Sequence, residues 1–73
     1  MTERGGRAVA ELVIAHVARD MEPIQLRENL LGAQEADPTL GISAAYIDLA
    51  VLAYTNDRAR YHAKLAAQKQ GTP

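Results

Sequence analysis

A chain of 73 residues without cysteine can form one small domain, and neither disulfides nor a thiolate metal site can stabilise it. Eight Lys and Arg residues nearly balance nine Asp and Glu residues, so a net charge of −1 provides no overall field to attract nucleic acid. Composition thus excludes the small disulfide-rich class and favours protein partners.

Two apolar stretches, 12–18 and 42–54, are the candidates for a signal peptide or a membrane span. The first contains His16, and the second contains Asp48. Both fall short of the ~20 apolar residues that a membrane helix requires. We therefore expect a soluble, cytoplasmic protein without membrane contact, and a virion is the alternative location.

Two short helices are expected in the first half of the chain. After Gly5 and Gly6, apolar side chains recur at three- and four-residue spacing and predict a helix over about 7–20. Pro23 cannot continue that helix but suits the first turn of a second one, which we place at about 23–34. The second helix carries a broad, irregular apolar arc, so it needs tertiary packing to persist.

A third, longer helix is expected over about 42–68. Asp37 and Pro38 form a helix-start pattern, but Gly41 and Ser43 leave two possible starts. The helix begins either at Pro38, or after a short turn that ends at Gly41, with Ser43 as its cap. Beyond Ser43, the stretch around Asn56 is the one place where it could bend or restart.

The predicted fold is all-α, with two short helices packed on a long C-terminal helix in a three-helix hairpin or bundle. All of residues 1–73 form a single domain in this prediction. A chain of this size is near the lower limit for an independent core, so self-association or a partner is often needed.

The long helix carries apolar side chains on two sides. What we call the small-residue row consists of Ile42, Ala45, Leu49, Leu52, Asn56, Ala59, Ala63 and Ala66. What we call the tyrosine row is turned by about 140° on the 3.6-residue helix and consists of Ile47, Val51, Tyr54, Arg58, Tyr61 and Leu65. A helix that is apolar on two sides must be covered on two sides. We expect the small-residue row to hold the fold and the tyrosine row to be the interface with a protein partner or a second copy.

The C-terminal end of the tyrosine row is expected to remain uncovered. Two helices of ordinary length can cover only part of a helix about 40 Å long, which leaves Tyr61 and Leu65 for another chain. Tyr46 and Tyr54 have the alternative of completing an intramolecular core. Asn56 either sets the register of a buried interface or begins a break in the helix.

No set of catalytic residues converges in the sequence. His16 and Asp20 are four residues apart and could supply two metal ligands or a general base, but no third member accompanies them. We interpret His16 as a partly buried histidine that hydrogen-bonds to Asp20. Ser43 lacks the surrounding turn glycines of a nucleophile elbow. We expect no enzyme activity, no cofactor, no metal and no small-molecule substrate.

The sequence favours a non-enzymatic helical protein-protein interaction or assembly subunit, with a phage or virion structural component as one form of that role. A small DNA-binding or partner-inhibiting regulator is the alternative. A helix-turn-helix with Gly41 in its turn would begin its second helix with residues 44–49, which offer few donors to bases or phosphates. The basic residues come later and are dispersed around the helix: Arg58, Arg60, Lys64 and Lys69. We therefore expect a protein partner in preference to nucleic acid.

Overall fold

The computed structural model describes residues 3–71, with side chains through Lys69. Its elements, in chain order, are α1 (Glu3–Ala18), α2 (Pro23–Ala36), the short 3₁₀ helix η1 (Pro38–Leu40) and α3 (Ala44–Gly71). No strand occurs within the described range, so the predicted all-α fold with three helices is confirmed.

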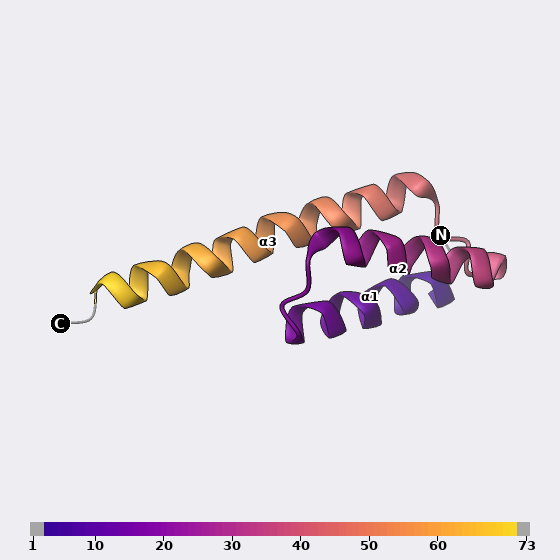
Figure 1. Ribbon diagram of the computed structural model, residues 1–73. Helices are drawn as coiled ribbons and strands as arrows, with labels where there is room; N and C mark the ends of the chain where they lie inside the picture. The colour runs from indigo at the N-terminus through magenta and orange to yellow at the C-terminus, as the bar shows by residue number, and fades with distance from the viewer. Residues whose placement is uncertain (1–2, 72–73) are drawn as a thin grey trace.

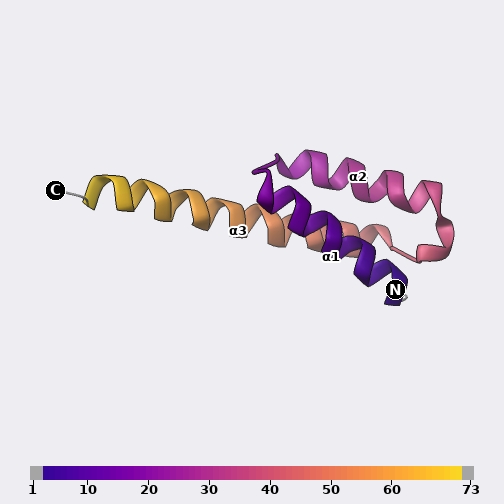
Figure 2. The same cartoon turned by 90° about the horizontal axis from the view of Figure 1, so that it is seen from below.

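The three α-helices run up, down and up. Figures 1 and 2 show α2 antiparallel to both α1 and α3, so that α1 and α3 run in the same direction. α2 lies against both neighbours, and α3 packs more extensively on α2 than on α1. This arrangement leaves the side of α1 that is turned toward α3 only partly covered.

α3 continues past the ends of the other two helices, as the yellow part of the ribbon shows (Figure 1). We call residues 59–71 the overhang, and every side chain in its described part, 59–69, is exposed. The radius of gyration is 14.5 Å. A compact chain of this length would have about 11 Å. The overhang therefore makes the molecule elongated, with extents of 53 × 19 × 19 Å.

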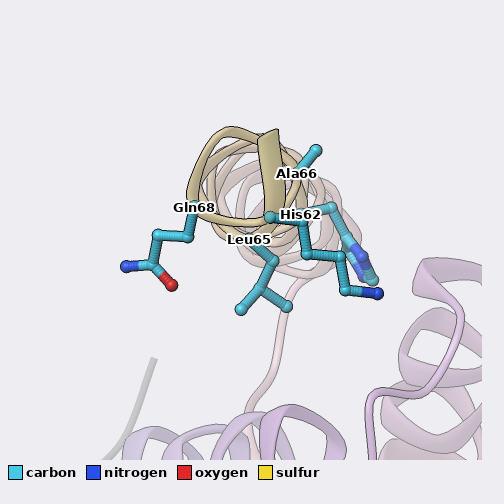
Figure 3. A pocket seen from close by; sticks show the side chains of 5 residues that line it. His62, Leu65, Ala66 and Gln68 are labelled. Carbon is cyan, nitrogen blue, oxygen red and sulfur yellow. The ribbon is translucent and has the colours of Figure 1, made fainter. Parts of the chain in front are cut away.

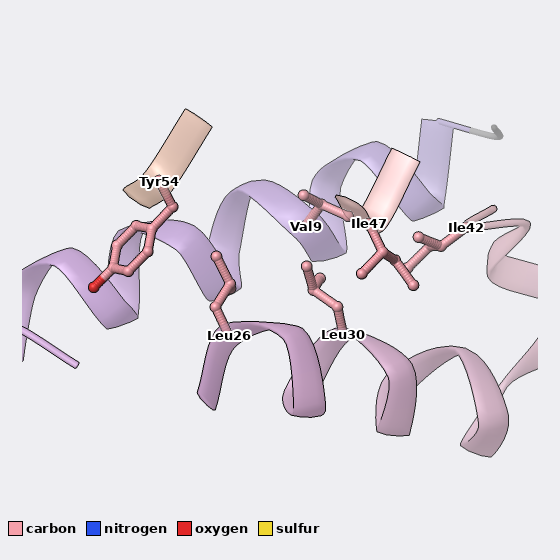
Figure 4. Close-up of a cluster of buried hydrophobic side chains, with 6 residues drawn as sticks. All are labelled: Val9, Leu26, Leu30, Ile42, Ile47 and Tyr54. Carbon is pink, nitrogen blue, oxygen red and sulfur yellow. The ribbon is translucent and has the colours of Figure 1, made fainter. Parts of the chain in front are cut away.

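The core is small and lies along α2. Figure 4 shows Leu26 and Leu30 of α2 extending toward Val9 of α1 and toward Ile47 and Tyr54 of α3. Ile42, in the loop before α3, closes one end of this cluster. Large aliphatic side chains and one tyrosine therefore supply most of the apolar burial that holds the helices together.

α1 begins at Glu3, earlier than the predicted start at residue 7, and includes both glycines. The guanidinium of Arg4 explains the extra turn, because it donates to Asp37 Oδ2 at 2.8 Å and to Thr39 Oγ1 at 3.0 Å. Gly5 is also buried. These tertiary contacts offset the low helix propensity of glycine.

α1 ends at Ala18, before the predicted end at residue 20. The N–H of Met21 donates to the carbonyl of His16 at 3.0 Å, and the N–H of Asp20 donates to the carbonyl of Val17 at 3.2 Å. Asp20 has a φ of 50°, so this is a Schellman-type ending with an aspartate in the left-handed position. The turn directs the chain toward α2 and places Asp20 beyond the helix.

The sequence allowed two starts for α3, and the structure has the later one. η1 ends at Gly41 with a left-handed φ of 67°, and the Oγ of Ser43 accepts from the N–H of Tyr46 at 3.1 Å. The helix then runs without a break through Asn56. The hydroxyl of Thr55 donates to the carbonyl of Val51 at 2.7 Å, so this polar residue is accommodated within the helix.

Candidate interaction surface

The two rows of α3 are placed the other way round from the prediction. Within α3, every member of the small-residue row is exposed, including Leu49 at 64% and Leu52 at 57%. The N-terminal part of the tyrosine row packs against α1 and α2 instead. The prediction that this row holds the fold is therefore wrong for its members within α3, and only Ile42, in the loop before the helix, joins the core.

The structure divides the predicted interface residues into two groups. Ile47 and Tyr54 are 2% and 3% exposed and belong to the intramolecular core, which was the open alternative for Tyr54. They offer no surface to another chain. Val51 and Arg58 are partly buried at the edge of the core. The remaining two are on the overhang, where Tyr61 is 58% and Leu65 is 38% exposed, and their contact with a partner stays a prediction.

His16 is buried, but Asp20 is not its partner. Its Nδ1 lies 2.6 Å from the carbonyl oxygen of Leu12, and its Nε2 lies 3.0 Å from the side-chain nitrogen of Asn29. We assign Nδ1–H as the donor and Nε2 as the acceptor, which is a neutral imidazole. The predicted bond to Asp20 is wrong because α1 ends before that residue, so the one-turn spacing does not apply.

Asp20 instead contacts α3 at the point where the overhang begins. Its Oδ1 accepts from Arg58 Nε and from His62 Nε2, each at 3.1 Å, and Arg58 also donates to Glu22 Oε1 at 3.2 Å. The hydrogen bond from His62, together with the positive charge of Arg58, holds the pKa of Asp20 below its ordinary value. We call these four residues the loop clamp, because they fix the α1–α2 loop on α3.

Neither a metal site nor a membrane helix is found in the described part of the chain. Among residues 3–71, no three His, Asp or Glu side chains come together where they could hold a metal ion. The helices of this range are also not long and apolar enough to cross a membrane.

An open groove of about 650 Å³ runs between α1 and α3. Apolar and small side chains line its length, among them Val13 and Val17 of α1 and Ala50 of α3. Tyr61 stands at the end where the overhang begins. The α1 wall of this groove was not predicted, although Val13 and Val17 are four residues apart on the predicted helical face.

A second, shallower hollow of about 430 Å³ lies on the overhang itself. Figure 3 looks along α3 and shows Leu65 between Gln68 on one side and His62 on the other. Apolar surface thus continues from the groove past Tyr61 to Leu65.

Charge is segregated along the chain. All nine acidic residues lie in 1–57 with four arginines, giving −5 for that part. Residues 58–73 contain four basic residues and no acidic one, giving +4, and the two parts sum to the net charge of −1. An acidic three-helix body therefore carries a basic helical extension.

No protein-family profile, curated protein or solved structure matches this chain. The fold and surface define its class as a small three-helix bundle with a projecting, partly apolar third helix.

Proposed function

We propose that the protein is a non-enzymatic helical interaction or assembly subunit, for example a structural component of a phage or virion. Its contacts are made by the surface of α3 that the rest of the chain leaves open. The observation that carries this proposal is the combination of exposed leucines at positions 49 and 52 with exposed Tyr61 and Leu65 on one helix of a 7.9 kDa chain. The leucines and the Tyr61–Leu65 pair each place neighbouring apolar side chains in solvent, and exposed apolar patches are a feature of interaction sites.

The composition of the overhang supports the same proposal. Alanine, lysine, glutamine, arginine and leucine dominate residues 59–69, and these residues favour helix without tertiary contacts. The overhang can therefore project as a helix, yet its apolar side chains serve no intramolecular core. A tyrosine such as Tyr61 joins a large ring to a hydroxyl, which suits a partly wet interface.

Sedimentation velocity and light scattering test the proposal. At micromolar concentrations we expect a mass above that of the 7.9 kDa monomer, or concentration-dependent aggregation when a partner is absent. Substituting Ile14 of α1, which is 68% exposed, by Ser is the matched control and should leave association unchanged. A well-folded monomer at every concentration would count against an assembly role.

A regulator that binds DNA is the second candidate, because residues 58–73 carry four basic and no acidic side chains. Arg58 is already paired with Asp20 and Glu22, and Arg60 lies 3.8 Å from Asp57. This leaves few free cations for phosphates. A mobility shift on duplex DNA that weakens steeply with added salt would favour the regulator.

A further inference from the structure

We propose that the partner is a second copy of this chain, which docks on the small-residue row so that the two α3 helices pack antiparallel about a two-fold axis near Asp57 and Arg58. This proposal rests on the interaction role proposed above and names its occupant and geometry. Three features of the described residues support it: the order of side-chain sizes in the row, the segregation of charge, and the position of Asn56.

Side-chain size changes along the exposed row in a self-complementary way. The leucines at 49 and 52 precede Asn56, and only alanines follow it in the row, at positions 59, 63 and 66. In an antiparallel pair about this axis, Leu52 faces Ala63 of the second copy, and Leu49 faces Ala66. Each large residue then meets a small one, which allows close packing of two helices. A parallel pair would instead place alanine against alanine along the C-terminal half.

Charge favours the same orientation. Residues 1–57 carry a charge of −5, and residues 58–73, which include the overhang, carry +4. Antiparallel packing places the overhang of each copy beside the part of α3 that belongs to the acidic body of the other copy. Parallel packing would place the two basic overhangs side by side. Asp48 and Lys69 flank the row on the same side, and the proposed alignment brings Asp48 close to the second copy's Lys69, twice by symmetry. Asp48 already lies 3.7 Å from Arg27 of its own chain, and its side chain is exposed, so it can contact Lys69 of the second copy as well.

Asn56 is the one polar residue of the row and lies within a helical turn of the proposed axis. In this alignment Asn56 faces Ala59 of the second copy, and the two asparagines are offset by about one helical turn across the interface, where their amides can hydrogen-bond. A polar side chain at such a position fixes alignment at the cost of some affinity. This gives Asn56 a role, since it is exposed in the monomer and the helix does not break there.

Cysteine pairing tests the orientation directly, because the chain has no cysteine of its own. One protein carries Leu52→Cys and another carries Ala63→Cys, and both sites are exposed, so the monomer fold should be unaffected. Mixing the two under mild oxidation should give the mixed disulfide in several-fold excess over either same-variant dimer. Predominant pairing within each variant would indicate a parallel dimer and overturn the proposal, as would no more cross-linking than Ile14→Cys gives.

Substitutions with equilibrium measurements provide the second test. Leu49→Glu with Leu52→Glu should raise the dimer dissociation constant roughly 100-fold, about tenfold for each leucine lost from the interface. Ile14→Glu is the matched control and should change it little. Asp48→Lys and Lys69→Asp should each weaken the dimer about threefold, and the two together should restore it, since the pair is reversed.

The outcomes separate this inference from the proposed function. If the chain associates but the leucine substitutions have no effect, while Tyr61→Ser with Leu65→Ser abolishes association, the face of Tyr61 is the interface and only this inference fails. If the chain is monomeric under all conditions and binds no partner, both proposals fail.

Discussion

The phenol of Tyr54 donates a 2.6 Å hydrogen bond to the carbonyl of Met21 and so joins the middle of α3 to the turn between α1 and α2. The carbonyl of His16 lies 3.1 Å from the same oxygen, and the His16 ring stands edge-on to the tyrosine with centroids 6.4 Å apart. Burial raises the pKa of Tyr54, so the hydroxyl remains a protonated donor at neutral pH. One side chain therefore connects all three helices just before the overhang begins.

Replacing Tyr54 by Phe should lower the free energy of unfolding by about 1–2 kcal/mol, because the carbonyl of Met21 loses its buried donor while the ring packing is kept. Urea unfolding followed by circular dichroism at low protein concentration measures this change. Tyr61→Phe is the control, since the Tyr61 side chain is exposed, and it should leave the midpoint unchanged. Equal effects of the two substitutions would contradict the role assigned to the Tyr54 hydroxyl.

The loop clamp should make stability depend on pH through Asp20. Folding lowers the pKa of this carboxyl, chiefly through the hydrogen bond from His62, so ionised Asp20 stabilises the fold above its unfolded pKa. That contribution is lost as the pH falls through the lowered, folded-state pKa. We therefore expect wild type to melt at a higher temperature than Asp20→Asn at about pH 5, and the difference to disappear as the pH falls through the lowered pKa of Asp20.

Asn is the suitable replacement because it tolerates the left-handed φ of 50° at this position and removes only the charge. Asp37 also has a lowered pKa, caused first by a hydrogen bond from Thr39, but it is present in both proteins and cancels in the comparison. Arg58 and His62 contact Asp20 directly and lose its charge in the Asn variant, so the comparison reports on the loop clamp as a unit. A melting difference that grows on acidification would refute the assignment.

The order of helices could be predicted from the sequence because proline positions and apolar periodicity determine helix starts and helical faces through neighbouring residues alone. Pro23 occupies the first turn of α2, and Ser43 caps α3 as one of the two predicted starts had it. The early start of α1 could not be predicted from local rules. It depends on Arg4 reaching Asp37 across the fold, a contact between residues far apart in sequence.

Tertiary contacts decide which of the two rows of α3 is buried. Both rows have helical spacing, and periodicity alone does not say which one faces α2. The feature that distinguishes the buried row is the Tyr54 hydroxyl, which reaches two backbone carbonyls at the α1 turn. The pairing of Asp20 with His62 was missed for a related reason, since it requires the left-handed turn that ends α1.

Two glycines should respond to alanine in opposite ways. Gly32 lies in α2 with no atom beyond its chain neighbours and the adjacent helix backbone within 4 Å of the position that a Cβ would take, so Gly32→Ala should stabilise the fold by about 0.5–1 kcal/mol. Gly41 ends η1 at a φ of 67°, where a side chain is strained, so Gly41→Ala should destabilise by about 1–2 kcal/mol. Chemical denaturation of both variants measures the two signs. Stabilisation by both would mean that the left-handed turn before α3 is not required.

Removing residues 63–73 separates the fold from the interaction, since the truncated chain keeps the loop clamp and every side chain of the core. We expect the full-length protein to melt at higher temperature as its concentration rises, because association stabilises the folded state by mass action. The truncated chain should show no such dependence, and the two melting temperatures should converge at the lowest concentration. Full-length Ile14→Ser should retain the dependence. A truncated protein that melts well below wild type even when dilute would mean that the overhang stabilises the monomer itself, which its exposed side chains do not predict.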